Sequence, residues 1–134
     1  MFLLDTNVVS ELRRVRPHGA VLAWIATVPN TGLHLSAVTI GELQTGVERT
    51  RDRDPGKAAE LETWLAQIAA GYPILPMDGA VFREWARLMH RRSNTLAQDA
   101  MIAATAIIHN LTVATRNVRD FEPLGAMTFN PFKT

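Results

Sequence analysis

The sequence contains no cysteine among its 134 residues. Disulfide bonds and thiolate metal sites are therefore excluded, and this composition fits the reducing environment of the cytoplasm. The chain also has no uninterrupted run of about 18 strongly apolar residues, so we expect neither a transmembrane helix nor a membrane partner. Its first residues lack the basic region that precedes the apolar core of a secretory signal, so we expect no such signal.

Lysine is scarce, because Lys57 and Lys133 are the only two lysines among 14 basic residues. The arginines form four clusters along the chain: Arg13, Arg14 and Arg16; Arg49, Arg51 and Arg53; Arg83, Arg87, Arg91 and Arg92; Arg116 and Arg119. Their planar guanidinium groups match phosphate oxygens, which favours a polyanionic ligand. Any single cluster is, however, more typical of a solvated helix face whose charge is balanced by neighbouring acids.

Hydrophobic residues make up 47% of the chain, enough for the core of one domain that spans residues 1–134. Short apolar segments alternate with segments of helical periodicity. Strands are predicted at residues 2–4, 32–35, 74–75, 111–114 and 127–129. Helices are predicted at residues 8–14, from about 17 to 28, and at 37–49, 55–70, 79–89 and 97–109. This alternation predicts the α/β class, with a three-layer α/β/α sandwich around a mainly parallel sheet.

Several residues are predicted to begin or end these helices. Ser36, Asp54 and Asp78 have the side chains and positions of N-caps. Thr95, followed three residues later by glutamine, matches a capping box, and Asn110 predicts a left-handed end to the same helix. Residues 50–54 are predicted to form a charged loop.

The first strand ends directly at Asp5, which Thr6 and Asn7 follow. In open parallel α/β sheets, ligands bind beyond the carboxyl ends of the strands, so Asp5 would lie in such a crevice. The alternative is that Asp5 or Thr6 only caps a helix, a common role for these residues.

Three further acidic residues are candidates for the same site. Asp99 lies in the first turn of a helix that is apolar nearly all round, where a carboxylate is costly unless it is paired or bound to a metal. Glu42 lies at the border of an apolar stripe, and taken alone it is typical of a surface glutamate. Asp120, in a predicted turn after a buried strand, is by itself typical of a loop residue.

Together these acids predict a metal site. Carboxylates that meet at one edge of a sheet raise one another's pKa unless a cation neutralises them. A set of oxygen ligands suits Mg²⁺ or Mn²⁺, and the four histidines have no ligand spacing among them. Without these four acids, basic residues outnumber acidic ones in the rest of the chain. An acidic, metal-loaded pocket on a basic protein is typical of a nuclease.

Four segments resemble, in the same order, motifs of the PIN-domain family, and in particular of the VapC-like toxins of bacterial type II toxin–antitoxin pairs. They are residues 2–13 (FLLDTNVVSELR), 35–43 (LSAVTIGEL), 99–106 (DAMIAATA) and 114–121 (ATRNVRDF). The resemblance implies a PIN-like sandwich and an Mg²⁺- or Mn²⁺-dependent endoribonuclease acting on RNA. It also implies a homodimer or a higher toxin–antitoxin assembly, with a cognate antitoxin that covers the active site.

Carried over by position, the resemblance implies that the metal-binding and catalytic acids are Asp5, Glu42, Asp99 and Asp120. Relatives place the fourth acid at either of two points, which here are Asn117 and Asp120; we take Asp120 as the acid and Asn117 as a polar helper. The resemblance further implies that Thr6, Asn7 and Thr115 orient the carboxylates or a metal-bound water, and that Arg116 contacts a phosphate. Two alternatives stay open, a housekeeping RNA-processing nuclease of the same family and a catalytically silent module that binds RNA or protein.

Overall fold

A computed structural model describes residues 1–133 of the chain. Its strands are β1 (Phe2–Leu4), β2 (Leu33–Ser36), β3 (Ile74–Leu75), β4 (Thr112–Ala114) and β5 (Thr128–Phe129). Its helices are α1 (Thr6–Glu11), α2 (Gly19–Thr27), α3 (Ala37–Arg51), α4 (Pro55–Gly71), α5 (Gly79–Met89), α6 (Ala97–His109) and α7 (Val118–Phe121). Short 3₁₀ helices cover Asn30–Gly32, Asn94–Leu96 and Glu122–Leu124. No helix within residues 1–133 has the length and apolar character needed to cross a membrane.

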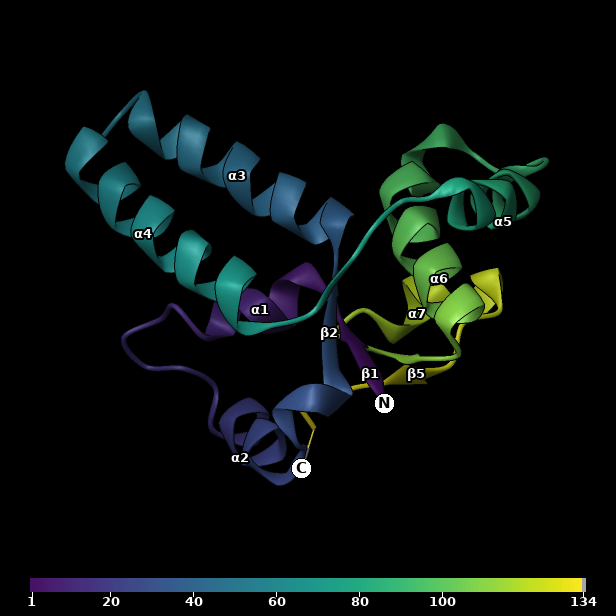
Figure 1. The fold of residues 1–134 in the computed structure, drawn as a ribbon, viewed down its shortest axis with the longest axis horizontal. Helices are drawn as coiled ribbons and strands as arrows, with labels where there is room; N and C mark the ends of the chain where they lie inside the picture. Colours follow the sequence, from purple (N-terminus) through teal and green to yellow (C-terminus); the bar gives the residue numbers. More distant parts are fainter. Residues whose placement is uncertain (134) are drawn as a thin grey trace.

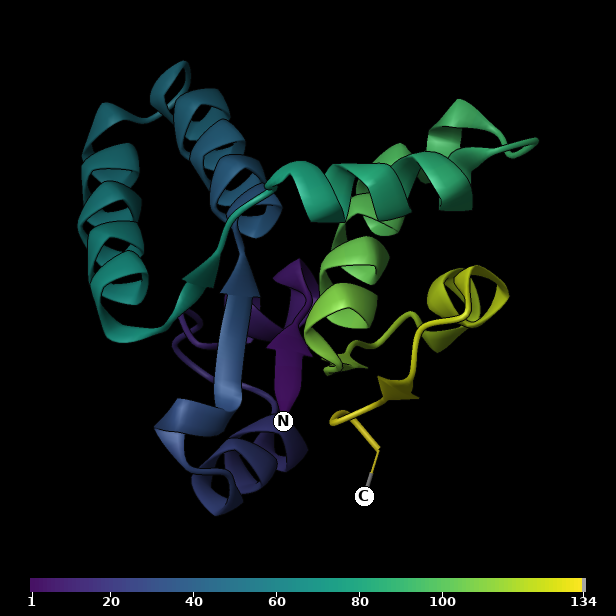
Figure 2. The ribbon, with the colours of Figure 1, turned by 45° about the vertical axis from the view of Figure 1, so that its right-hand side comes forward.

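The five strands form one parallel sheet in the order β3-β2-β1-β4-β5. The first strand therefore lies in the middle, where Leu3 pairs with His34 of β2 and with Val113 of β4. Because all strands run the same way, their carboxyl ends meet at one edge, from which α3 rises in Figure 2. Every residue placed just after a strand thus lies at that edge.

Helices cover both faces of the sheet, which confirms the predicted three-layer sandwich (Figure 1). Alternate residues of β1 point to opposite faces, as in any strand. Leu3 packs in a core cluster with Ile102 of α6 and Phe121 of α7. Leu4 packs on the other face in a cluster with Val9 of α1 and residues of α2 and α4. The core thus fixes β1 from both sides and positions the residue that follows it.

Most of the residues predicted to begin or end a helix do so in the structure. The side chains of Ser36, Asp54 and Asp78 accept backbone N–H groups at the starts of α3, α4 and α5. Asn110 ends α6 in the left-handed conformation, with φ of 56°. The capping box at Thr95 is wrong, because a 3₁₀ turn capped by Ser93 precedes α6, and α6 itself has no side-chain cap.

Several segments differ from the predicted bounds, most of them by one or two residues. The first helix covers Thr6–Glu11 instead of residues 8–14, and it begins early because the Asp5 carboxylate accepts the N–H of Thr6. Helix α3 continues to Arg51, so the predicted charged loop is shortened to residues 52–54. Asp120 lies in the short helix α7 instead of a turn.

Candidate active site

The carboxyl edge of the sheet brings the predicted acids together from four elements. Asp5 follows the central strand β1, and Glu42 lies in the second turn of α3, which follows β2. Asp99 lies in the first turn of α6, and Asp120 lies in α7, shortly after β4. The parallel order of β2, β1 and β4 is therefore what gathers residues that are far apart in the sequence.

Asp5 is the most firmly held of these acids. Asp5 is only 6% exposed, and its backbone N–H donates to the carbonyl of Ala114 at 2.9 Å, which extends the pairing of β1 with β4 by one residue. One carboxylate oxygen accepts the N–H of Thr6 at 2.8 Å. The other accepts the Thr115 hydroxyl at 2.8 Å and the Asn7 amide at 3.2 Å. Asp5 does cap a helix, as the alternative interpretation supposed, but it also faces the other carboxylates.

Thr115 and Asn7 connect β1 to the segment after β4. The buried Thr115 hydroxyl donates to Asp5 and accepts the N–H of Asn117 at 2.9 Å. The side-chain carbonyl of Asn7 accepts the N–H of Arg116 at 3.2 Å. Arg116 and Asn117 are exposed, and the guanidinium of Arg116 lies 3.9 Å from the centre of the Phe132 ring. These hydrogen bonds join the Asp5 carboxylate to the segment after β4, and the orienting role of Asn7 and Thr115 stays a prediction.

Glu42 has an unusual environment for a helical glutamate. The residue is half-buried, and its Oε1 atom is a buried side-chain oxygen with no hydrogen-bond partner within residues 1–133. Burial and the nearby carboxylates of Asp5 and Asp99 raise its pKa, while the Thr6 hydroxyl lowers it. That hydroxyl also lies 3.4 Å from the hydroxyl of Thr39, one helical turn before Glu42. Thr39 is not among the site residues predicted from the sequence, although its spacing of three residues from Glu42 on a helix was a usable signal.

The remaining two acids differ in exposure. Asp99 is half-buried, and burial together with the carboxylates of Asp5 and Asp120 raises its pKa to about 6. Asp120 is exposed at the rim. The pKa of Asp5 is raised mainly by burial, and the charge of Asp120 raises it further. These mutual effects mean that all four carboxylates share one electrostatic site.

The donor set fits a hard cation. A buried oxygen without a partner is costly, and a cation beside Glu42 Oε1 would satisfy it while relieving the repulsion among the acids. As placed, no three acidic, histidine or cysteine side chains of residues 1–133 lie close enough together to hold an ion. Mg²⁺, however, is usually bound through one or two carboxylates and keeps several waters. The arrangement therefore suits Mg²⁺ or Mn²⁺ better than a metal enclosed by protein ligands.

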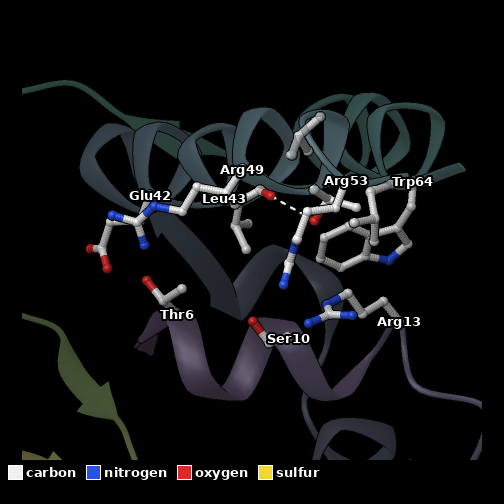
Figure 3. A pocket seen from close by; sticks show the side chains of 12 residues that line it. Thr6, Ser10, Arg13, Glu42, Leu43, Arg49, Arg53 and Trp64 are labelled. Atoms are coloured by element: carbon white, nitrogen blue, oxygen red, sulfur yellow. Dashed lines mark hydrogen bonds between the residues drawn. The ribbon is translucent and has the colours of Figure 1, made fainter. Parts of the chain in front are cut away.

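Two grooves flank the acids. The first, of about 340 Å³, lies between α1, α3 and α4; Glu42 and Thr6 stand at one end, and Arg13 and Trp64 at the other (Figure 3). The second, of about 330 Å³, lies beyond β4 and is lined by Arg116, Asn117, Val118, Arg119, Asp120, Asn130 and Lys133. Each groove thus joins basic residues to one of the site acids.

Comparisons with known proteins agree with this arrangement. The model of the PIN domain family matches residues 2–125. The chain is 37% identical over 142 residues to VapC ribonuclease Y4jK of Sinorhizobium fredii, with 99% of each chain covered. It is 36% identical over 138 residues to toxin FitB of Neisseria gonorrhoeae, with 98% of this chain and 99% of the relative covered. Its fold matches the crystal structure of FitAcB from Neisseria gonorrhoeae with a TM-score of 0.88, 37% identity and full coverage of both chains. The chain therefore belongs to the PIN-domain family, among its VapC-like toxins.

Proposed function

We propose that this protein is a metal-dependent endoribonuclease and the toxin of a toxin–antitoxin pair. The observation that carries the proposal is the edge that gathers four carboxylates, where burial and neighbouring acids raise the pKa of Asp5, Glu42 and Asp99 and where Glu42 Oε1 has no hydrogen-bond partner within residues 1–133. The relatives named VapC ribonuclease and toxin FitB support both the activity and the toxin role.

The residues at this edge have different proposed roles. Asp5, Glu42, Asp99 and Asp120 would hold Mg²⁺ or Mn²⁺; when bound, such an ion supplies a Lewis acid and lowers the pKa of a bound water. Thr115 and Asn7 hold the Asp5 carboxylate in one orientation. Without a metal, burial and the neighbouring carboxylates raise the pKa of Asp99 to about 6, and a bound cation would offset this repulsion and keep the group ionised, able to accept a proton from the attacking water.

The products follow from the residue types present. The chain has no cysteine, and the proposed nucleophile is water, which attacks the phosphorus while the P–O3′ bond breaks and the leaving 3′-oxygen takes a proton. Cleavage then leaves a 5′-phosphate and a 3′-hydroxyl. Arg116, at the rim beyond Asn7, is exposed and placed to contact a phosphate of the RNA.

The toxin assignment brings partners with it. We propose that a cognate antitoxin covers the carboxylate edge, that the toxin forms a homodimer or a larger assembly with it, and that both act in the cytoplasm, where the RNA substrate is found. The alternative of a housekeeping nuclease of this family predicts the same chemistry without a neutralising partner.

The decisive test is cleavage of total RNA by the purified protein with Mg²⁺, with Mn²⁺ and with EDTA. Asp99→Asn is the diagnostic variant, because the Asp99 carboxylate caps no helix and has no hydrogen bond within residues 1–133 whose loss would complicate the result. Asp52→Asn, in an exposed residue after α3, is the matched control. Discrete cleavage that needs metal and disappears only in Asp99→Asn supports the proposal; equal cleavage by all three proteins would refute it.

The toxin role has a separate test. Induced expression of the protein should arrest bacterial growth, and expression of Asp99→Asn at the same level should not. Arrest by both proteins would mean that toxicity does not come from the carboxylate edge.

A further inference from the structure

Three arginines line the groove beside Glu42, and we call this feature the arginine groove, after Arg13, Arg49 and Arg53. Arg13 follows α1, Arg49 lies in the last turn of α3, and Arg53 lies in the turn that joins α3 to α4. Figure 3 shows the side chains of Arg13 and Arg53 pointing into the space between α1 and α3, while the Arg49 side chain runs along α3 towards Glu42. Two separate arginine clusters of the sequence therefore meet on one surface.

These three arginines are exposed, and within residues 1–133 none of them forms an ion pair. Their neighbour Arg51 behaves differently, because it pairs with Glu48 at 3.1 Å and with Glu62 at 3.3 Å. Of the arginines at the end of α3, Arg51 is therefore neutralised by acids, while Arg49 and Arg53 are not paired with any acid within residues 1–133. The arginines that face the groove are the ones that form no ion pair within residues 1–133, which is the electrostatic footprint of an anionic ligand.

The position of the groove indicates what kind of anion it takes. Glu42, one of the proposed metal-binding acids, lines the same groove. On the other side of the central residue Asp5, the second groove joins Asp120 to Arg116 and Arg119. Positive charge thus lies on both sides of the acids along the carboxyl edge of the sheet. A polyanion that crosses the edge would have its reacting phosphate at the acids and its flanking phosphates on arginines.

The groove also has an apolar wall, formed by Leu43, Val47, Leu61 and Trp64. Trp64 packs partly into the core beneath the groove, so it is a fixed surface and not a mobile platform. A ribose or base can lie against such a wall while its phosphates stay on the charged side.

We propose that the arginine groove binds the single-stranded RNA that flanks the cleavage site, with Arg13, Arg49 and Arg53 on consecutive backbone phosphates. This inference rests on the proposed nuclease function. It favours RNA over an acidic protein partner because the free charges continue past the acids into a second basic groove, as the path of a long polyanion requires.

The test measures RNA binding without cleavage. A short mixed-sequence single-stranded RNA labelled with fluorescein is titrated, in EDTA and at several KCl concentrations, with Asp99→Asn protein as the parent. The groove triple variant carries Arg13→Gln, Arg49→Gln and Arg53→Gln in addition. The control triple variant carries Arg83→Gln, Arg87→Gln and Arg91→Gln, which remove the same charge from α5 and the residues after it.

If each groove arginine neutralises one phosphate, the groove triple variant loses about 2 from the slope of log Kd against log salt, since each single-strand contact contributes about 0.7. At about 0.1 M salt, that change corresponds to a loss of affinity on the order of 100-fold. The control triple variant should bind like the parent. Replacing the three groove arginines by lysine should keep most of the slope, because lysine keeps the charge.

Thermal unfolding followed by circular dichroism checks that both triple variants fold like the parent. Equal RNA affinity and equal salt slope for the groove and control variants would overturn the inference and leave the groove to an acidic protein partner. That result is distinguishable from failure of the nuclease proposal, which the separate cleavage assay on the wild-type protein reports. A parent that binds no RNA at all would also overturn the inference, while the proposed nuclease function would still be decided by the cleavage assay.

Discussion

Replacing Asp99 by asparagine should stabilise the metal-free protein even though it removes the proposed activity. In the folded protein the pKa of Asp99 is raised from 3.8 to about 6. At about 1.4 kcal/mol for each pKa unit, the full shift would correspond to about 3 kcal/mol of free energy of unfolding. Because the side chain is only half-buried, solvent screening reduces this contribution to about 1 kcal/mol.

The sign of the effect follows from where the proton is held. Between the unfolded pKa of 3.8 and the folded pKa of about 6, the folded protein keeps a proton that the unfolded chain has lost. Stability therefore falls as the pH rises through this window and stays low above it. The advantage of Asp99→Asn should be absent at pH values below the window and complete at neutral pH.

The assay is thermal unfolding of wild type and Asp99→Asn in EDTA, on both sides of the pH window, and again with MgCl₂. For a chain of this length, about 1 kcal/mol corresponds to an increase in Tm of roughly 3–5 °C for the variant at neutral pH. Mg²⁺ at ten times its Kd would stabilise the wild type by about 1.4 kcal/mol and the variant by less. Adding the metal should therefore reduce the difference in Tm between the two proteins. Asp52→Asn, in an exposed residue, should change neither series. A lower Tm for Asp99→Asn in EDTA at neutral pH would refute the reasoning.

Three further predictions use other parts of the structure. The Kd of Mg²⁺, measured by titration calorimetry, should rise as the pH falls below about 6, because a proton then competes with the metal for Asp99; a Kd that is constant across this range would contradict the role of Asp99 as a ligand. Thr115→Val should lower the free energy of unfolding in urea by about 1–3 kcal/mol and also lower kcat, since Asp5 and the N–H of Asn117 both lose a buried partner. Thr105→Val, whose hydroxyl contacts the carbonyl of Met101 and the sulfur of Met77 but none of the four acids, should leave kcat unchanged. Asn110→Ala should cost about 1 kcal/mol in the same urea assay because of its φ of 56°, and Asn110→Gly should not; equal stabilities would mean that the left-handed turn carries no strain.

The helix starts could be predicted where one side chain decides them. Ser36 and Asp54 cap their helices through their own oxygen atoms, a property that the residue type carries with it. Thr95 has the same chemistry but loses the position to Ser93, because the chain makes a 3₁₀ turn first. That turn depends on tertiary packing, in which the Trp85 indole donates to the carbonyl of Ala97 at 3.0 Å. Local spacing does not contain this contact.

The candidate site was predictable as far as strand ends determine it. The apolar strand before Asp5 and the one before Thr115 place both residues at one edge as soon as the sheet is parallel. The burial of Glu42 was not predictable, because helical periodicity puts it at the border of the apolar stripe. Thr6 of α1 lies against the face of α3 that carries Thr39 and Glu42. The burial of Glu42 therefore depends on how these two helices are placed relative to each other.

The central place of β1 also has a consequence for how the protein is made. A ribosome produces Asp5 among the first residues, but the hydroxyl that orients its carboxylate belongs to Thr115, 110 positions later. Asp99 and Asp120 also come late, so a chain shorter than 99 residues carries only Asp5 and Glu42 of the four acids. Contacts between such distant residues form last in synthesis and slowly in folding. The carboxylate edge proposed as the nuclease site can therefore be complete only after residue 120 has been made, so an antitoxin that covers this edge would need to meet only a nearly complete chain.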